Sequence, residues 1–115
     1  MSSMTDTETY NGWKNRETWA FNLHWQNDQG LYSVTLDEAR EWMKDYPLIA
    51  EADQTGSHLG EAVVTYWRDV IDSYGGEFGT GLPVVLAMMR DEVGSWWRID
   101  YAEVGAAVRE SLDND

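Results

Sequence analysis

Residues 57–76 read SHLGEAVVTYWRDVIDSYGG, and this stretch carries the clearest periodicity of the chain. Its apolar residues recur at intervals of three and four, namely at Leu59, Ala62, Val63, Tyr66, Trp67, Val70, Ile71 and Tyr74. Such spacing places them on one broad face of an α-helix, which turns once in about 3.6 residues. Gly75 and Gly76 end the pattern. The stretch predicts a long helix covered along one side by the rest of the protein.

Upstream of it, the residues around Asn15 predict a first helix. Asn15 is a favourable N-cap residue, and Glu17 follows in the first turn, where a negative charge is stabilised by the helix dipole. Gly30 stands where a helix stop is expected. We therefore expect a helix from about Arg16 to Asn27.

Two further segments have helical signals. Residues 35–38 read TLDE, the pattern of a capping box with Thr35 as the N-cap, and apolar residues follow at helical spacing until Pro47. Residues 82–93 read LPVVLAMMRDEV, a nearly continuous apolar run that fits either a helix or a buried strand. Its Leu, Ala and Met residues favour the helix, whereas its Val pair favours the strand.

The last signal is DYAEVGAAVRESL at residues 100–112, where Asp100 and Glu103 form a second capping box. With it the sequence predicts about five helices and contains no convincing hairpin signal. We expect an all-α, compact single-domain bundle with a Trp-rich core over residues 13–113. Residues 1–12 are expected to form a flexible N-terminal segment.

The composition is strongly acidic, with 21 Asp and Glu against 8 Lys and Arg and a formal net charge of -13. Such a surface repels phosphate backbones, so we expect no direct binding to nucleic acid. The surplus acid has three explanations: a solvated coat that keeps the protein in solution, adaptation to high salt, and mimicry of a polyanion. The Lys-poor, Asp-rich balance resembles that of proteins from salt-loving archaea, although genomes of high GC content also favour Arg over Lys.

Several functional classes lack the residues they need. Cys is absent, which excludes disulfides, thiolate metal sites and a Cys nucleophile. No apolar run approaches the roughly 20 residues of a membrane helix, and the N-terminus has no export signal, so a soluble cytoplasmic protein without membrane contact is expected. In the glycine-rich stretch at 75–81, no Lys and Ser or Thr follow in the order that a phosphate loop requires.

Two His residues stand near carboxylates, His24 four residues before Asp28 and His58 three before Glu61. Neither pair matches a metalloenzyme pattern, and a hydrogen-bonded, half-buried His24 and a His58 beside a helix cap are the expected roles. We therefore assign no catalytic, metal or cofactor-binding residue and expect a protein that is not an enzyme.

Residues 10–32, YNGWKNRETWAFNLHWQNDQGLY, contain the pattern Asn-Gly-Trp-x-Asn-x-Glu-Thr-Trp. This stretch resembles the opening of an uncharacterised family of small proteins from phages, plasmids and their hosts. Residues 95–108, SWWRIDYAEVGAAV, are similar to the ending of the same family. The resemblance covers about the first and the last quarter of the chain. It implies an all-α accessory protein of a mobile element, and it supplies no reaction and no catalytic residue.

Four residues of the motif are expected to have structural roles: Trp13, Asn15, Glu17 and Trp19. Asn15 caps the first helix, so that Trp13 lies just before the cap and Trp19 one turn after it. The two indoles are then placed to pack like a hydrophobic staple.

Three other tryptophans, Trp25, Trp96 and Trp97, are candidates for contact with a partner, because Trp is enriched at binding hot spots. Trp96 and Trp97 are the stronger pair. Adjacent residues cannot both face the same way, so one of these two rings is expected at the surface.

An acidic row is the other candidate surface. Asp37, Glu41 and Asp45 follow one another at four-residue steps along one helix edge, where like charges oppose helix formation. Arg40 and Lys44 offer local compensation. The alternative is that the row copies the charge spacing of a nucleic-acid backbone. That candidate face consists of Asp37, Glu38, Glu41, Asp45, Glu51 and Asp53.

Two functions follow from these surfaces. The first is a non-enzymatic protein-binding accessory module that attaches to a partner protein through its aromatic patch. The alternative is an acidic DNA-mimicking inhibitor of a host DNA-binding or defence complex. A halophile-adapted protein with a metal-dependent activity ranks below both, and a homodimer contact is a further use of an exposed aromatic surface.

Overall fold

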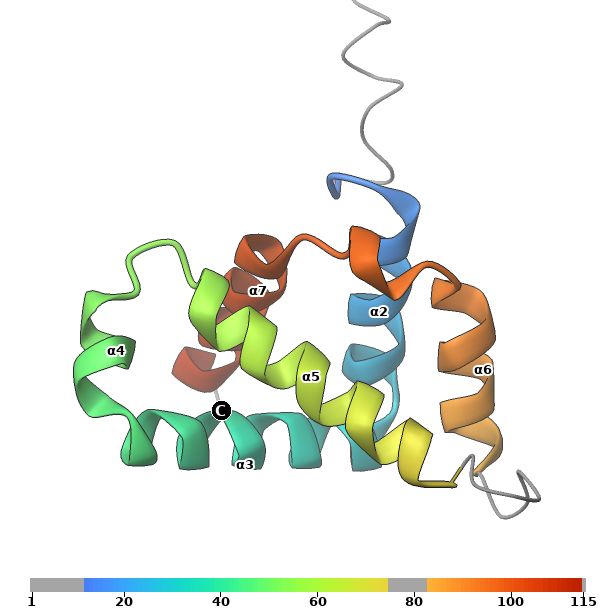
Figure 1. Ribbon diagram of the computed structural model, residues 1–115, viewed down its shortest axis with the longest axis horizontal. Helices are drawn as coiled ribbons and strands as arrows, with labels where there is room; N and C mark the ends of the chain where they lie inside the picture. Colours follow the sequence, from blue (N-terminus) through green and yellow to red (C-terminus); the bar gives the residue numbers. More distant parts are fainter. Residues whose placement is uncertain (1–11, 75–82, 115) are drawn as a thin grey trace, which may run out of the picture.

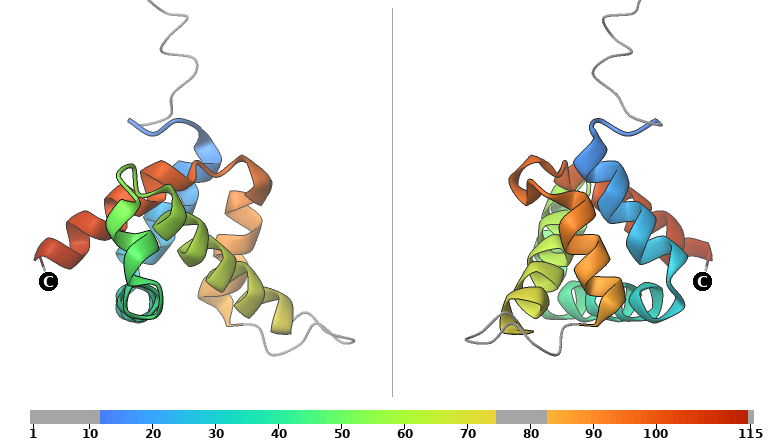
Figure 2. Two further views of the ribbon diagram at one scale, coloured as in Figure 1. Left: turned by 60° about the vertical axis from the view of Figure 1, so that its left-hand side comes forward. Right: turned by 90° about the vertical axis from the view of Figure 1, so that its right-hand side faces the viewer.

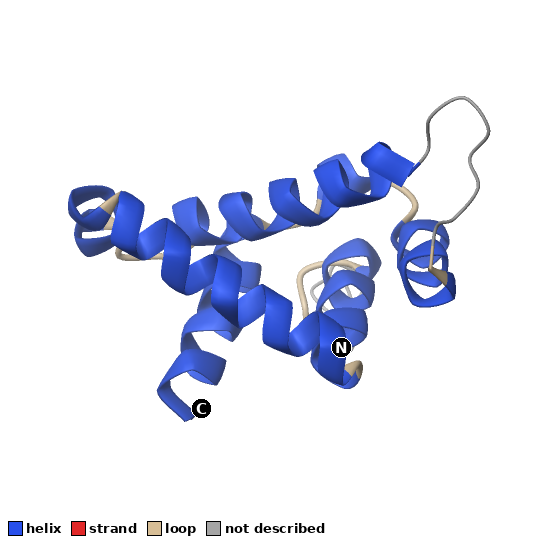
Figure 3. Ribbon diagram, turned by 90° about the horizontal axis from the view of Figure 1, so that it is seen from below, coloured by secondary structure: helices blue, strands red, loops and turns tan. Residues whose placement is uncertain are grey.

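The computed structural model describes residues 12–74 and 83–114. These residues form six α-helices and one short 3-10 helix, η1, and no β-strand (Figures 1 and 3). The elements are α2 (Arg16–Asn27), α3 (Gln29–Asp45), α4 (Pro47–Ala52), α5 (Ser57–Tyr74), α6 (Val84–Val93), η1 (Trp96–Arg98) and α7 (Tyr101–Asn114). The prediction of an all-α single-domain bundle is confirmed. Most of the N-terminal segment and the glycine-rich stretch after α5 lie outside the described residues.

Helix α5, which crosses the front of the molecule in Figure 1, packs against α3, α4, α6 and α7. Behind it lies α7, and the packing between these two helices is the most extensive of the fold. α3 runs along the lower edge, while α2 and α6 lie side by side at the right (Figures 1 and 2). The short helix α4 packs against α3 and α5 at the opposite end from α6.

Glycines allow α5 and α7 to approach closely. A Cβ atom added to Gly60 of α5 would lie 2.7 Å from the carbonyl carbon of Tyr101, and one added to Gly105 of α7 would lie 2.9 Å from the Cα atom of Gly56. Real side chains do not tolerate such distances to backbone atoms. Gly56 also has a φ angle of 87°, in the region that favours glycine. The crossing therefore depends on backbone-to-backbone contact.

The predicted bounds of α2 are confirmed, whereas the helix stop at Gly30 and the helix start at Thr35 are wrong. Asp28, in an extended conformation, ends α2, and its carboxylate accepts a hydrogen bond from the backbone N–H of Leu31 at 2.9 Å. One residue therefore ends α2 and caps α3. As a result, Gly30 lies in the first turn of α3, and Thr35 is buried in the middle of that helix.

Downstream, α3 ends before Pro47 as predicted, but Pro47 also begins the short helix α4, which the sequence did not predict. Residues 84–93 are helical, which settles the choice left open for the apolar run. Asp100 caps α7 by accepting a hydrogen bond from the backbone N–H of Glu103 at 3.1 Å.

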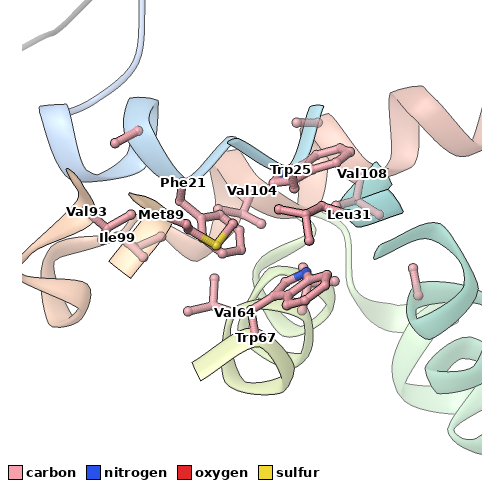
Figure 4. Packing of buried hydrophobic residues seen from close by; sticks show 14 of the residues in the cluster. Phe21, Trp25, Leu31, Val64, Trp67, Met89, Val93, Ile99, Val104 and Val108 are labelled. Atoms are coloured by element: carbon pink, nitrogen blue, oxygen red, sulfur yellow. The ribbon is translucent and has the colours of Figure 1, made fainter. Parts of the chain in front are cut away.

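The core is mainly aliphatic and joins all the long helices (Figure 4). Two of the seven tryptophans, Trp25 and Trp67, lie within it. Four others pack against it while partly buried, namely Trp13, Trp19, Trp42 and Trp96. Trp97 is 78% exposed. Tryptophan therefore lies at the edge of the core more than inside it, and the expectation of a Trp-rich core is not confirmed.

Both buried indole groups have hydrogen-bond partners. Trp25 donates from Nε1 to the side-chain oxygen of Asn22 at 2.8 Å, and Trp67 donates to the hydroxyl of Thr35 at 2.9 Å. A buried N–H without a hydrogen-bond partner destabilises the folded state. Asn22 and Thr35 therefore allow the two indoles to be buried without this cost.

Candidate functional site

The Asn-x-Glu-Thr part of the N-terminal motif joins the start of α2 to the segment before α7. The Oδ1 atom of Asn15 accepts hydrogen bonds from the backbone N–H and the hydroxyl of Thr18, at 2.8 and 2.7 Å. Its Nδ2 atom donates to the carbonyl of Arg98 at 2.8 Å. Asn15 therefore caps α2 as predicted and also holds a segment 83 residues away. An asparagine suits both tasks because its amide both accepts and donates.

A second connection runs through Thr18 and Glu103. The buried hydroxyl of Thr18 accepts a hydrogen bond from the backbone N–H of Asp100 at 2.9 Å. The carboxylate of Glu103 accepts one from the backbone N–H of Lys14 at 2.7 Å, so it does not complete the predicted capping box with Asp100. The helix starts of α2 and α7 thus stabilise each other.

The other motif residues also have structural positions. A carboxylate oxygen of Glu17 lies 3.8 Å from Nε of Arg98, and Trp13 and Trp19 are partly buried against the core. Trp13, Glu17 and Trp19 therefore contribute to the packing of the protein and do not form an exposed binding site.

The two His residues have different surroundings. The half-buried His24 lies 2.7 Å from a carboxylate oxygen of Glu92 on α6. His58 is exposed at the start of α5 and donates its backbone N–H to Asp53. Within residues 12–74 and 83–114, no group of three or more such side chains is placed to hold a metal ion.

Asp53 does not belong to the acidic face, because it is 4% exposed and caps α5. Its carboxylate accepts hydrogen bonds from the backbone N–H groups of His58 and Leu59, at 3.2 and 3.0 Å, and lies 3.6 Å from the guanidinium of Arg109. Burial alone raises the pKa of this carboxyl, but the two hydrogen bonds and Arg109 together hold it below its usual value. The residue is structural.

The remaining acids of that face are exposed or half-buried along α3 and α4: Asp37, Glu38, Glu41, Asp45 and Glu51. Arg40 compensates part of the row, with an Nη1 atom 3.3 Å from Asp37. A hollow of about 150 Å³ lies beside the row and is lined in part by Trp42 and Tyr46. The structure thus keeps most of the row accessible and partly neutralises it.

The three candidate tryptophans have different surroundings. Trp25 has no exposed surface and stacks on Tyr32 with the ring centres 6.0 Å apart, so its assignment to a partner contact is wrong. Trp96 is half-buried and packs edge-on against Phe21, with the ring centres 5.6 Å apart. Trp97 points outward and is 78% exposed, so the expectation that one ring of the adjacent pair reaches the surface is confirmed.

Trp97 borders a groove of about 400 Å³ between α5, the end of α6 and the segment that leads into η1. Figure 2 (right) shows these elements side by side. The groove is lined by Arg68, Ile71, Asp72, Arg90, Gly94, Ser95, Trp96 and Trp97. The guanidinium of Arg98 stands 5.7 Å from the centre of the Trp97 ring, within the range of a cation–π contact.

Two Arg residues in this groove were not candidates in the sequence. Arg90 bonds through Nε to Asp91 at 3.0 Å, whereas Arg68 makes no hydrogen bond or ion pair with any residue that the structure describes. The sequence places Arg68 outside the apolar face of its helix. This position predicts that Arg68 is exposed, but it does not predict a binding role. Its position beside Trp97 depends on packing between segments that are distant in sequence.

Among the described residues, no helix is both long enough and apolar enough to cross a membrane. In comparisons with known proteins, residues 6–77 match one protein family, described as a family of unknown function (DUF7249). No curated protein and no solved structure matches the chain.

Proposed function

The chain belongs to the DUF7249 family of unknown function, and we propose that it is a non-enzymatic protein-binding accessory module of the cytoplasm. Its docking surface is the groove beside Trp97, defined by the residues that line it. The exposure of Trp97 is the observation that supports this function most directly.

An indole that is 78% exposed leaves a large apolar ring in water, and its contact with a partner would remove that surface. Single exposed aliphatic residues are common on protein surfaces, so the 79% exposed Leu48 does not carry the same weight. Trp97 differs because it borders a groove with two Arg residues, and Trp and Arg are the residues most enriched at binding hot spots.

The test is capture of a partner from the native cytoplasm by the wild-type chain and by Trp97→Ser. We expect Trp97→Ser to weaken retention by about 30-fold or more, because truncation of a hot-spot residue costs about 2 kcal/mol or more. Leu48→Ser is the matched control, since it removes an equally exposed apolar side chain elsewhere. Equal retention by wild type and Trp97→Ser would contradict the proposal.

The alternative function is inhibition of a DNA-binding or defence complex by mimicry of nucleic-acid charge. It is favoured by the accessible row Asp37, Glu41 and Asp45, which lies beside the small hollow of Trp42 and Tyr46. Under this alternative, the triple change Asp37→Asn, Glu41→Gln and Asp45→Asn abolishes capture. Retention should also fall steeply between about 0.15 and 1 M salt, as the screening length shortens from about 8 to 3 Å. A contact centred on Trp97 is expected to survive both changes.

The resemblance of the N-terminal motif supports a further part of the proposal, an origin in a phage, plasmid or archaeal virus. The genes that neighbour other family members test this origin, and a consistent chromosomal housekeeping context would contradict it. If the captured partner is a second copy of the chain, the groove is a homodimer contact, and sedimentation of wild type and Trp97→Ser separates the two cases.

A further inference from the structure

We propose that the groove beside Trp97 binds a peptide segment of the partner that carries one Asp or Glu side chain next to an apolar residue. In this arrangement, Arg68 receives the carboxylate and Trp97 the apolar side chain. The inference rests on the proposed function and adds the chemistry of the partner to it.

Arg68 is the residue that selects a carboxylate. Most cations of this acidic chain pair with acids in the fold, as in Lys14–Asp100, Arg40–Asp37, Arg90–Asp91 and Arg109–Asp53. Arg68 has no such partner among the described residues, although Asp72 lines the same groove. A guanidinium presents a planar set of donors that matches a carboxylate in geometry and charge. Its donors, which have no partner among the described residues, are therefore available to a carboxylate of the ligand.

The charges in and beside the groove are balanced, so an acid of the ligand is attracted by direct contact with Arg68 and not by a net positive charge. Arg68 and Arg90 contribute two positive charges, Asp72 contributes one negative charge, and Arg90 is already engaged by Asp91. The whole chain carries -13, which repels a polyanion. At physiological salt the screening length is about 8 Å, so the guanidinium next to a ligand outweighs more distant acids. A single side-chain carboxylate fits this balance better than a phosphate backbone.

The apolar part of the segment has its own place. Trp97 offers its exposed ring, whose position is supported by the guanidinium of Arg98, and Ile71 and Trp96 supply apolar surface within the groove. The groove volume of about 400 Å³ lies in the range of about 300–1,000 Å³ that is typical of ligand sites.

Single-stranded nucleic acid is the competing occupant, because exposed Trp and Arg residues also bind stacked bases and phosphates. The net charge of the chain disfavours it. It therefore enters the experiment as a separate arm.

The experiment follows the indole N–H signal of Trp97 in the ¹⁵N-labelled full chain by NMR, with Trp97→Phe to assign it. The probes are the peptide acetyl-Ser-Leu-Phe-Glu-Ser-amide, versions with one or two extra Ser between Phe and Glu, and the matching Gln peptides. We expect at least one Glu peptide to move the Trp97 signal. Its Gln counterpart should bind about tenfold more weakly, since it lacks the charge-assisted hydrogen bonds.

Arg68→Gln and Lys44→Gln form a matched pair of variants, because each removes one exposed positive charge that has no partner among the described residues. Arg68→Gln should weaken the Glu peptide about tenfold, whereas Lys44→Gln, on α3, should leave its affinity unchanged.

Equal binding of the Glu and Gln peptides, equal loss in both variants, or no movement of the Trp97 signal overturns the inference. A single-stranded DNA of about twelve nucleotides that moves the signal at a lower concentration than the Glu peptides overturns it in favour of nucleic acid. In all these cases the proposed function is decided independently, by whether Trp97→Ser releases the partner captured from the cytoplasm.

Discussion

Gly60 of α5 and Gly105 of α7 face each other where the two helices cross, so closely that a Cβ atom on Gly60 would lie 2.9 Å from the backbone nitrogen of Gly105. Because no side chain separates them there, the backbones themselves fix the spacing of the most extensive helix packing in the protein. Arg68 and Ile71, which line the groove, lie farther along the same helix α5.

Replacing Gly60 by Ala should lower the free energy of unfolding by about 3 kcal/mol, because the new methyl group would overlap with the backbone of Tyr101. Urea denaturation measures the loss. Gly30→Ala is the control: its methyl group would meet only a carboxylate oxygen of Asp28, at 3.2 Å, and Ala favours a helix. We expect that change to stay within about 1 kcal/mol. Equal stability of the two variants would show that the crossing is not tight.

Thr35→Val should destabilise the protein by about 1–3 kcal/mol, since it removes the acceptor of the Trp67 indole and leaves a buried N–H without a partner. Thermal unfolding of the variant gives the effect. Thr65→Val is a matched change at an exposed position of α5, where the cost should be under about 0.5 kcal/mol. The hydrogen bond would have no importance if both variants unfolded together with the wild type.

Asn15→Asp separates the two tasks of Asn15. Aspartate preserves the cap on Thr18 but cannot donate to the carbonyl of Arg98, so a loss of about 1 kcal/mol is expected from the missing cross-connection. Asn15→Ala removes both contacts and should cost about 2 kcal/mol. Chemical denaturation of the two variants provides the comparison. An Asp variant as stable as the wild type would rule out the connection to Arg98 as a source of stability.

Asp53→Asn should be about 2 kcal/mol less stable than the wild type at neutral pH, because the charged cap of α5 and its pairing with Arg109 are lost. The pKa of Asp53 is lower in the folded protein than the unfolded value of about 3.9. The wild-type advantage is therefore full above about pH 5 and disappears as the pH falls through the folded-state pKa. Denaturation between about pH 7 and 3 measures this narrowing. Asp45→Asn, at an exposed site, should show a difference under about 0.5 kcal/mol throughout. A gap between Asp53→Asn and wild type that widened in acid would contradict the assignment.

The sequence predicted a helix correctly where the capping and apolar residues that stabilise the helix all lie within one segment. The bounds of α2 followed from Asn15, and the extent of α5 followed from its apolar period, because capping and amphipathic spacing act within a few turns. The start of α3 was missed for an equally physical reason. Two capping patterns compete, at Asp28 and at Thr35, and the pairing of Thr35 with Trp67, 32 residues away, places Thr35 inside the helix.

The same division applies to the candidate site. Adjacency in the chain was enough to predict that Trp96 and Trp97 face different ways. For Trp25, in contrast, the neighbouring residues in the sequence did not show whether its ring is buried or exposed, and the structure encloses it in the core. Asp53 was grouped with surface acids because its partner Arg109 lies 56 residues away.

The sequence by itself determined an all-α chain with strong negative charge, the span of α2 and α5, and an outward-facing ring at 96–97. Only the tertiary structure decided which tryptophan lies in the core, which acid is buried, and which Arg residues stand beside Trp97. The physical reason is range: helix periodicity and capping act between neighbours in the chain. Burial and the pairing of charges, in contrast, are set by helices that pack against each other from distant parts of the sequence.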